Sequence, residues 1–278
     1  MNTLDDIVAA LDGGTVIPYL GAGMLHLVPD YAVPSTPEAL VEKLTAKASV
    51  PHKIRNSLTR AAQFIENFKH RKTLVTLMDE AFSATPKYSP LHAHLASLDL
   101  PLIVDTWYDD AMNAALTGRK NWGQIQGLSQ SEHFGHWTGT FSPDGVAMEA
   151  LPATCKTLLY KPLGSHSPAA NYLVSDTDFV EVLTEIDIQT PIPAEVQVLR
   201  SGRSFLFLGC RFNDQLARSF ARQIMKRSSN RHWAVLPQKL TRMESRFLEE
   251  QNITRIEMPL DVFAAQLIAA TQPRAVAA

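Results

Sequence analysis

The stretch TVIPYLGAGM, residues 15–24, decides the fold of this chain. Its first six residues are mostly apolar and rich in β-branched side chains, which predicts a buried strand. The strand runs straight into Gly21-Ala22-Gly23-Met24, a tight turn of the kind that ends a parallel strand beneath a phosphate, with the positive end of the next helix facing the anion. Glycine at positions 21 and 23 would let backbone N–H groups approach a pyrophosphate closely. Because position 26 is histidine, the spacing is not that of G-x-G-x-x-G, and the turn alone does not establish a nucleotide site.

Further strands are predicted along the chain, each an apolar stretch followed by a helical pattern. They cover residues 100–107, 157–164, 204–210, 231–237 and 253–259. Helices that alternate with strands in this way favour a parallel sheet with helices on both faces. We therefore expect an α/β fold with a doubly wound, mostly parallel, Rossmann-like sheet of about six strands.

The predicted domain organisation follows from the spacing of the first two strands. Amphipathic patterns predict several helices over residues 35–100, the first with cap candidates at Ser35 and Thr36 and the next with apolar positions from Ile54 to Phe68. This stretch is too long for a simple crossover. We expect a helical subdomain there, inserted in a sheet domain made of residues 1–34 and 101–270. Residues 118–152 have no clean periodicity and suggest an irregular excursion that could act as a lid. Later helices are expected to begin at Asp176 or Thr177, at Asn213 and at Thr241. Residues 271–278 are expected to fray.

Composition narrows the classes of function. The 278 residues include 26 Lys and Arg against 28 Asp and Glu, a formal charge of −2, so no global positive field would gather nucleic acid. No apolar stretch approaches the length of a membrane span, and the N-terminus lacks the features of a secretion signal, so we expect a cytoplasmic protein. Cys155 and Cys210, the only cysteines, are too few for a disulfide framework or a paired-thiolate zinc site, and both are expected to be buried thiols.

The motifs occur in a characteristic order. In this chain they read VIPYLGAGM, LPLIVDTWYDDAMNAAL, LLYKPLGS, YLVSDTDFVEVL and SFLFLGCRFNDQLARSF. The order resembles that of the divergent prokaryotic branch of the sirtuin (silent information regulator) family, with its G-A-G-x-S, T-T-N-Y-D, Y-K-L-H-G, T-x-x-D-Y and F-x-G-x-S-x-x-D. The resemblance covers nearly the whole chain. It implies a doubly wound sheet that binds NAD, with the adenine half over G-A-G and the nicotinamide beside an asparagine and a histidine.

Two departures from the family pattern bear on catalysis. Trp107 stands where the pattern has its catalytic asparagine, and Leu163 stands where it has its catalytic histidine. Leucine has no titratable proton, so it cannot perform acid–base chemistry. The remaining histidine candidate for that role is His166, three residues further on. The four-cysteine zinc ribbon of the protein-deacylating sirtuins is also missing, which argues against lysine deacylation.

The resemblance also implies a set of cofactor-binding residues. The expected ligand is NAD or a related adenine nucleotide, with ADP-ribose and FAD as further options, and no metal site is expected. For Asp109 the alternative is that it caps the following helix, and for Arg211 the alternatives are a phosphate contact and a solvated side chain. The full set comprises Gly21, Ala22, Gly23, Met24, Thr106, Asp109, Gly164, Gly209, Cys210, Arg211 and Asp214.

The leading functional hypothesis is a dinucleotide-binding, sirtuin-like pseudoenzyme that has lost NAD cleavage and acts as a nucleotide sensor or a partner-binding scaffold. A second hypothesis is a defence-type NAD-hydrolysing enzyme, an NAD glycohydrolase rather than a protein deacylase, that uses the displaced His166. A third is a flavin-binding protein, and a fourth is a structural protein with an empty cleft. The expected partners are a small-molecule nucleotide and a protein or a second copy of the chain, with no membrane and no nucleic acid.

Overall fold

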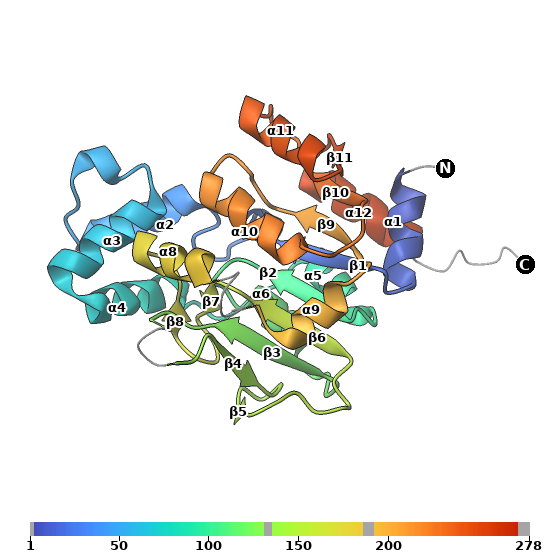
Figure 1. Cartoon of the computed structure of the whole chain (residues 1–278), viewed down its shortest axis with the longest axis horizontal. Coiled ribbons are helices and arrows are strands. Elements are labelled where there is room, and N and C mark those ends of the chain that lie inside the picture. The colour runs from blue at the N-terminus through green and yellow to red at the C-terminus, as the bar shows by residue number, and fades with distance from the viewer. Residues whose placement is uncertain (1–2, 131–134, 186–191, 272–278) are drawn as a thin grey trace, which may run out of the picture.

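A large twisted sheet forms the centre of the molecule (Figure 1). The computed structural model describes residues 3–130, 135–185 and 192–271. Within these residues, nine strands form one sheet in the order β11-β10-β9-β1-β2-β6-β3-β4-β5. The pairs from β11 to β3 are parallel, and those of β3 with β4 and β4 with β5 are antiparallel. The strands are β1 Val16–Leu20, β2 Leu102–Asp105, β3 Trp122–Gly127, β4 Thr138–Phe141, β5 Ala147–Met148, β6 Thr157–Lys161, β9 Ser204–Leu208, β10 His232–Val235 and β11 Ile253–Ile256.

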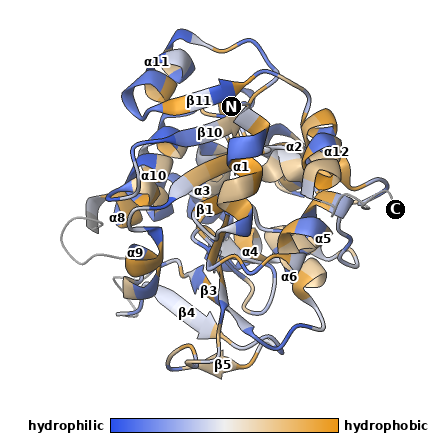
Figure 2. Ribbon diagram, turned by 90° about the vertical axis from the view of Figure 1, so that its right-hand side faces the viewer, coloured by the Kyte–Doolittle hydropathy of each residue, from blue (hydrophilic) through white to orange (hydrophobic). Residues whose placement is uncertain are grey.

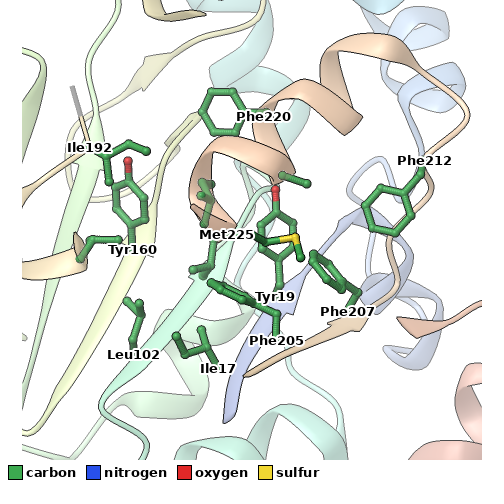
Figure 3. Close-up of a cluster of buried hydrophobic side chains, with 14 of the residues drawn as sticks. Ile17, Tyr19, Leu102, Tyr160, Ile192, Phe205, Phe207, Phe212, Phe220 and Met225 are labelled. Atoms are coloured by element: carbon green, nitrogen blue, oxygen red, sulfur yellow. The ribbon is translucent and has the colours of Figure 1, made fainter. Parts of the chain in front are cut away.

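Alternating side chains of the central strands supply two separate cores. Ile17 and Tyr19 of β1 point to one face, whereas Val16 and Leu20 point to the other. Figure 3 shows the first core, where Tyr19 lies beside Phe207 with ring centroids 4.8 Å apart. Both faces of each inner strand are therefore apolar, as a parallel sheet covered on both sides requires.

Helices cover both faces of the sheet, which confirms the α/β fold with a mostly parallel sheet. On the face of Tyr19 lie α8 (Asp176–Glu185), α9 (Ala194–Arg200), α10 (Gln215–Met225) and α11 (Arg242–Glu250). On the opposite face lie α1 (Thr3–Asp12), α5 (Pro90–Ser97), α6 (Ala111–Leu116) and α12 (Leu260–Thr271). Figure 2 shows α12 as largely hydrophobic and α11 as largely hydrophilic. None of the helices in the described part of the chain is both long and apolar enough to cross a membrane.

A group of helices between β1 and β2 packs around a third core, at the left of Figure 1. It contains α2 (Pro37–Lys47), α3 (Leu58–Lys69) and α4 (Arg71–Phe82), which we call the helical module, with the short 3-10 helix η2 (His52–Ile54) between α2 and α3. Thr36 begins α2 as expected, because its side chain accepts a hydrogen bond from Ala39 N–H. Helix α5 also lies between β1 and β2 in the chain, but it packs with α1, α6 and α12 in the core on one face of the sheet. The division into inserted subdomain and sheet domain remains a prediction.

The expectation of an irregular excursion over residues 118–152 was wrong. β3 lies in this range and pairs in parallel with β6, and β4 and β5 continue the sheet beyond it. The sequence of β3, WGQIQG, hides the strand because its core positions are filled by Gln124 and Gln126, which are at most 1% exposed. Their side-chain amides are satisfied by hydrogen bonds to the carbonyl groups of Ser167 and Ala169. Residues 131–134 of this range and 272–278 of the expected frayed tail lie outside the described residues.

Two helix starts also differ from the expectation. The glycine turn leads into η1 (Ala22–Leu27), a short 3-10 helix, rather than a full α-helix. Helix α10, expected to start at Asn213, is capped by Asp214, whose side chain accepts from the N–H groups of Leu216 and Ala217 at 2.7 and 3.2 Å.

Candidate functional site

The order of the strands places a switch point beside β1. From β1 the chain continues to β2, which lies on one side of β1 in the sheet. From β9, which lies on the other side of β1, it continues to β10, so the connections that follow β1 and β9 lead in opposite directions. In open parallel sheets, ligands bind outside the carboxyl ends of the strands at such a point. The turn after β1 and the turn after β9 are the two segments that form this place.

These two turns are packed directly against each other. Gly21 N–H donates to Leu208 O, and Gly23 N–H donates to Gly209 O, both at 2.9 Å. A Cβ atom at position 21 would lie 2.6 Å from Gly209 O. Gly209 has a φ of +65°, and a Cβ there would collide with Met24 N. The glycines are therefore required by the contact between the turns, and the N–H groups of Gly21 and Gly23 are already bonded.

Other N–H groups of the two turns remain available. Among the described residues, the structure gives no hydrogen-bond partner to the N–H groups of Ala22, Cys210 and Arg211. All three residues are at least partly exposed. Three unpaired backbone donors on adjoining turns can receive the oxygen atoms of an anion. The residues present therefore fit a phosphate-bearing ligand, through donors other than the two glycine N–H groups.

Arg211 has a partner inside the protein. Its Nε and Nη2 pair with the two carboxylate oxygens of Glu244 at 3.0 and 3.3 Å, in a fork geometry. Glu244 is fully buried and also receives Thr241 N–H in the capping box of α11. The Arg211 side chain is 38% exposed, so it is both partly solvated and paired, and its contact with a phosphate stays a prediction. The pair fixes the turn after β9 to α11 and leaves the backbone of Arg211 at the switch point.

Trp107 and Leu163, which the resemblance aligns with the two catalytic positions of the family pattern, both belong to packed cores. The Trp107 side chain is 6% exposed, and its indole N–H donates to Pro34 O at 2.7 Å. Its ring meets Phe82 of the helical module edge-on, with centroids 6.0 Å apart. Leu163 packs against both the sheet core and the module core. The indole therefore lies in the core of the helical module and anchors it to the end of β2.

A buried lysine organises the ends of β2 and β6. Lys161 Nζ donates to Asp105 Oδ2 at 2.6 Å and to Asp109 O at 2.8 Å, and its side chain is fully buried. Burial raises the pKa of Asp105 to about 6, against the attraction of the lysine. Burial lowers the pKa of Lys161, but the Asp105 and Asp109 carboxylates outweigh it and raise that pKa overall. The sequence pattern did not single out Lys161 or Asp105 as an ion pair.

Thr106 and Asp109 hold the loop after β2 in place. Thr106 donates both its N–H and its hydroxyl to Leu20 O, at 2.9 and 2.8 Å, which joins the ends of β1 and β2. Asp109 accepts Ala111 N–H at 2.8 Å and is 5% exposed. The N-cap residue of α6 is Asp110, so Asp109 supports the first turn of the helix from the position before the cap. A ligand contact of Asp109 stays a prediction.

Three further residues of the expected set lie in close contact with neighbouring parts of the fold. Gly164 has a φ of +84°, and a Cβ there would collide with Asn171 O. Met24 is 2% exposed and packs in the core of the sheet face covered by α12. Cys155 and Cys210 are half-buried, and not fully buried as expected. The Cys210 thiol points to Tyr19 O at 3.4 Å, and desolvation of the sulfur raises the pKa of this thiol well above its usual value.

His166 belongs to a hydrogen-bonded cluster that the sequence did not reveal. Its Nδ1 lies 3.3 Å from the hydroxyl of Tyr172, and that hydroxyl donates to Asp79 Oδ1 at 2.6 Å. Asp79 and Tyr172 are 93 residues apart, so no local spacing could have paired them. The cluster brings α4 of the helical module to β8 (Asn171–Tyr172), which pairs with β7 (Gly164–Ser165) at the carboxyl end of β6.

The histidines that could be drawn as metal ligands, namely His92, His94, His133 and His136, do not form a cluster in the described part of the chain. His92 is buried and bonded to Ser89, and His94 Nε2 lies 3.2 Å from the hydroxyl of Thr271. His133 lies outside the described residues. In the described part of the chain, no three His, Cys, Asp or Glu side chains are placed to hold a metal ion.

Comparison with known families gives one match. A family model described as a SIR2-like domain matches residues 101–256, which is more than half of the chain. The matched span includes Trp107, Leu163 and the turn after β9, whereas the turn after β1 precedes it. No curated protein matches the chain.

Proposed function

The chain belongs to the SIR2-like domain family, and on this basis we propose that it binds an adenine dinucleotide or a fragment of one at the switch point between β1 and β9. NAD and ADP-ribose are the ligands of choice, because both carry a diphosphate between two sugars. We further propose that the protein is a sensor or a scaffold for another protein, rather than an enzyme that cleaves its ligand.

One observation carries the binding proposal. The N–H groups of Ala22, Cys210 and Arg211 are without partners at the place where the two glycine turns meet. Unpaired backbone donors in ordered turns are uncommon away from water or a ligand. A diphosphate would be held by these three groups.

The loss of cleavage is proposed from the two replaced positions. NAD, when bound, supplies a glycosidic bond from which nicotinamide is a good leaving group. At the positions that the family pattern assigns to this reaction, the chain offers the buried indole of Trp107 and the alkyl side chain of Leu163. Neither group can accept or donate a proton at a sugar hydroxyl.

Isothermal titration with ADP-ribose tests the binding proposal. Ala22 is the first residue of η1 and follows Gly21, whose φ of −117° and ψ of 176° suit a residue before proline. Ala22→Pro therefore removes one donor while the backbone keeps its conformation, and Ala22→Ser is the matched control that retains the N–H. We expect Ala22→Pro to lower the affinity for ADP-ribose about tenfold or more, and Ala22→Ser to leave it nearly unchanged.

Three results would contradict these proposals. No binding of ADP-ribose or NAD to the wild-type protein would refute the nucleotide site, and equal affinities of the two variants would refute the assignment of the donors. Release of nicotinamide from NAD by the purified protein would refute the loss of cleavage. A substitution at Gly21 would not test the site, because any side chain there would meet Gly209 O and Cys210 and disturb the packing of both turns.

A further inference from the structure

The guanidinium group of Arg211 is held along one edge and free along the other. Its Nε and Nη2 each donate to one oxygen of the Glu244 carboxylate. Because arginine carries five N–H donors in one plane, three of them remain, two on Nη1 and one on Nη2. In the described part of the chain, Nη1 makes no hydrogen bond, and the Arg211 side chain is 38% exposed. The free edge can therefore donate to two oxygen atoms of an anion at once.

Glu244 fixes the direction of this free edge. Its side chain is fully buried, and one of its oxygens also accepts Thr241 N–H at 2.9 Å. Burial raises the pKa of Glu244, but the hydrogen bonds from Thr241 and Arg211 outweigh it and lower that pKa overall, so the carboxylate stays ionised. An arginine that is already held by two bonds to a buried acid loses little conformational freedom when a ligand binds. The pair therefore presents an oriented donor edge.

The free edge lies on the side of the switch point that faces β10. The proposed diphosphate donors belong to the turns after β1 and β9, whereas Glu244 lies in the first turn of α11, which follows β10 in the chain. In the sheet, β10 lies beside β9 on the side away from β1, one strand spacing of about 4.8 Å further along the edge. An anion at the free edge of Arg211 is therefore displaced from the diphosphate toward β10.

The charges at the two ends of the site differ in sign. The segments that follow β9 and β10, residues 209–218 and 236–244, hold four Lys and Arg against two Asp and Glu, and both acids already accept hydrogen bonds inside the protein. Residues 105–110, at the end of β2, hold three aspartates and no Lys or Arg, although one of the aspartates is paired with a buried lysine. Electrostatics therefore favour an additional phosphate over β10 and disfavour it over β2.

We propose that Arg211 is a specificity-determining residue that binds an additional phosphate group of the ligand, a monoester on the sugar that lies over β10. This inference rests on the proposed nucleotide site. Because the nicotinamide ring is positively charged, the acidic end over β2 favours it, and the adenosine ribose lies over β10. The ligand class is an adenine dinucleotide whose adenosine ribose carries a third phosphate, such as NADP, in preference to NAD. Arg211 makes the contact through Nη1 and Nη2, and Glu244 is a positioning residue that orients them.

Isothermal titration of the full chain with NADP and with NAD tests this assignment. We expect the wild-type protein to bind NADP about tenfold more tightly than NAD, as a charge-assisted fork to a phosphate would give. Arg211→Gln removes the charged edge and keeps the backbone N–H, so it should bring the affinity for NADP down to that for NAD and leave NAD binding nearly unchanged. Glu244→Gln keeps the shape of the side chain but weakens its hold on Arg211, so the affinity for NADP alone should fall several-fold.

Arg246 supplies the matched control. It is an arginine of α11 that also pairs with a glutamate, Glu250, but its side chain is 68% exposed. Arg246→Gln removes the same charge as Arg211→Gln and should leave the ratio of the two affinities as it is in the wild type. If Arg246→Gln lowered this ratio as much as Arg211→Gln does, the assignment to Arg211 would be overturned. If Glu244→Gln merely loosened α11, both ligands would lose affinity equally, and the positioning role would be overturned.

Failure of this inference can be told apart from failure of the proposed function. If neither NAD nor NADP binds to the wild-type protein, the nucleotide site and the contact with an additional phosphate are both wrong. If both ligands bind with the same affinity, the nucleotide site stands and the role of Arg211 is refuted.

Discussion

Single residues at the carboxyl edge of the sheet serve the packing as much as the site. Trp107 is the strongest case, because its indole N–H is bonded to Pro34 O and its ring contacts Phe82. We expect Trp107→Ala to lower the free energy of unfolding by about 3 kcal/mol or more, since it leaves a cavity and an unpaired carbonyl. Urea denaturation measures this, with Phe68→Ala as the control at a side chain that is 67% exposed. A similar small loss for both variants would show that the indole is not part of the core.

A buried histidine gives a prediction about pH. Burial lowers the pKa of His92 to about 4, and its Nδ1 lies 2.8 Å from the hydroxyl of Ser89. The unfolded chain therefore binds a proton at this residue near its ordinary pKa of about 6.5, and the folded chain does not. The stability is fully present above about pH 6.5 and falls as the pH decreases toward 4, by about 1 kcal/mol per pH unit from this residue.

Urea titrations between pH 4 and pH 7 check this expectation through the slope of stability against pH. His92→Gln should reduce that slope by the share of one histidine and leave the share of His232, whose pKa burial also lowers to about 4. His26→Gln, at an exposed position, should retain the whole slope. An unchanged slope in His92→Gln would contradict the account.

From the sequence we could predict which residues lie at the carboxyl edge of the sheet, but not which residues they contact there. Motif spacing located the turns around Gly21 and Gly209, because glycine is required wherever two turns approach so closely. It could not show that Arg211 pairs with Glu244, 33 residues away, or that Asp79 meets Tyr172. Such contacts depend on the packing of distant elements.

At the scale of elements, β3 shows why one strand escaped prediction. Gln124 and Gln126 occupy buried positions that hydrophobic patterns assign to apolar residues, and their amides are satisfied by the loop of Ser167 and Ala169. We expect the amide hydrogens of residues 123–126 to exchange with deuterium as slowly as we expect those of β6 to exchange, because both strands lie inside the sheet. Exchange as fast as in the exposed loop around Gly145 would restore the interpretation of this segment as a lid.

Helix starts were easier to predict than helix faces. The caps at Thr36 and Thr241 follow from local sequence, since a side chain only has to reach N–H groups two or three residues away. The apolar pattern of α3, in contrast, included Phe68, which is exposed and contacts Phe64 beside it. A periodic pattern shows which residues share one face of a helix, but it does not show how much of that face the neighbouring elements cover.

At the scale of the whole molecule, the order of the motifs was the best guide. It indicated a sirtuin-like α/β sheet, and the SIR2-like match to residues 101–256 confirms that assignment. The turn after β1 and the helical module precede the matched span, so their part in a ligand site rests on the structure: β1 lies beside β9, and the module is joined to the sheet through Trp107 and Tyr172. The ligand itself remains proposed.

The central claim is that a diphosphate is held by backbone donors of two adjoining turns. Nuclear magnetic resonance of the uniformly nitrogen-15-labelled protein, titrated with ADP-ribose, tests it most directly. We predict that the amide signals of Ala22, Cys210 and Arg211 shift downfield together and saturate at one ligand per chain. Saturable binding that leaves these three signals in place would contradict the account.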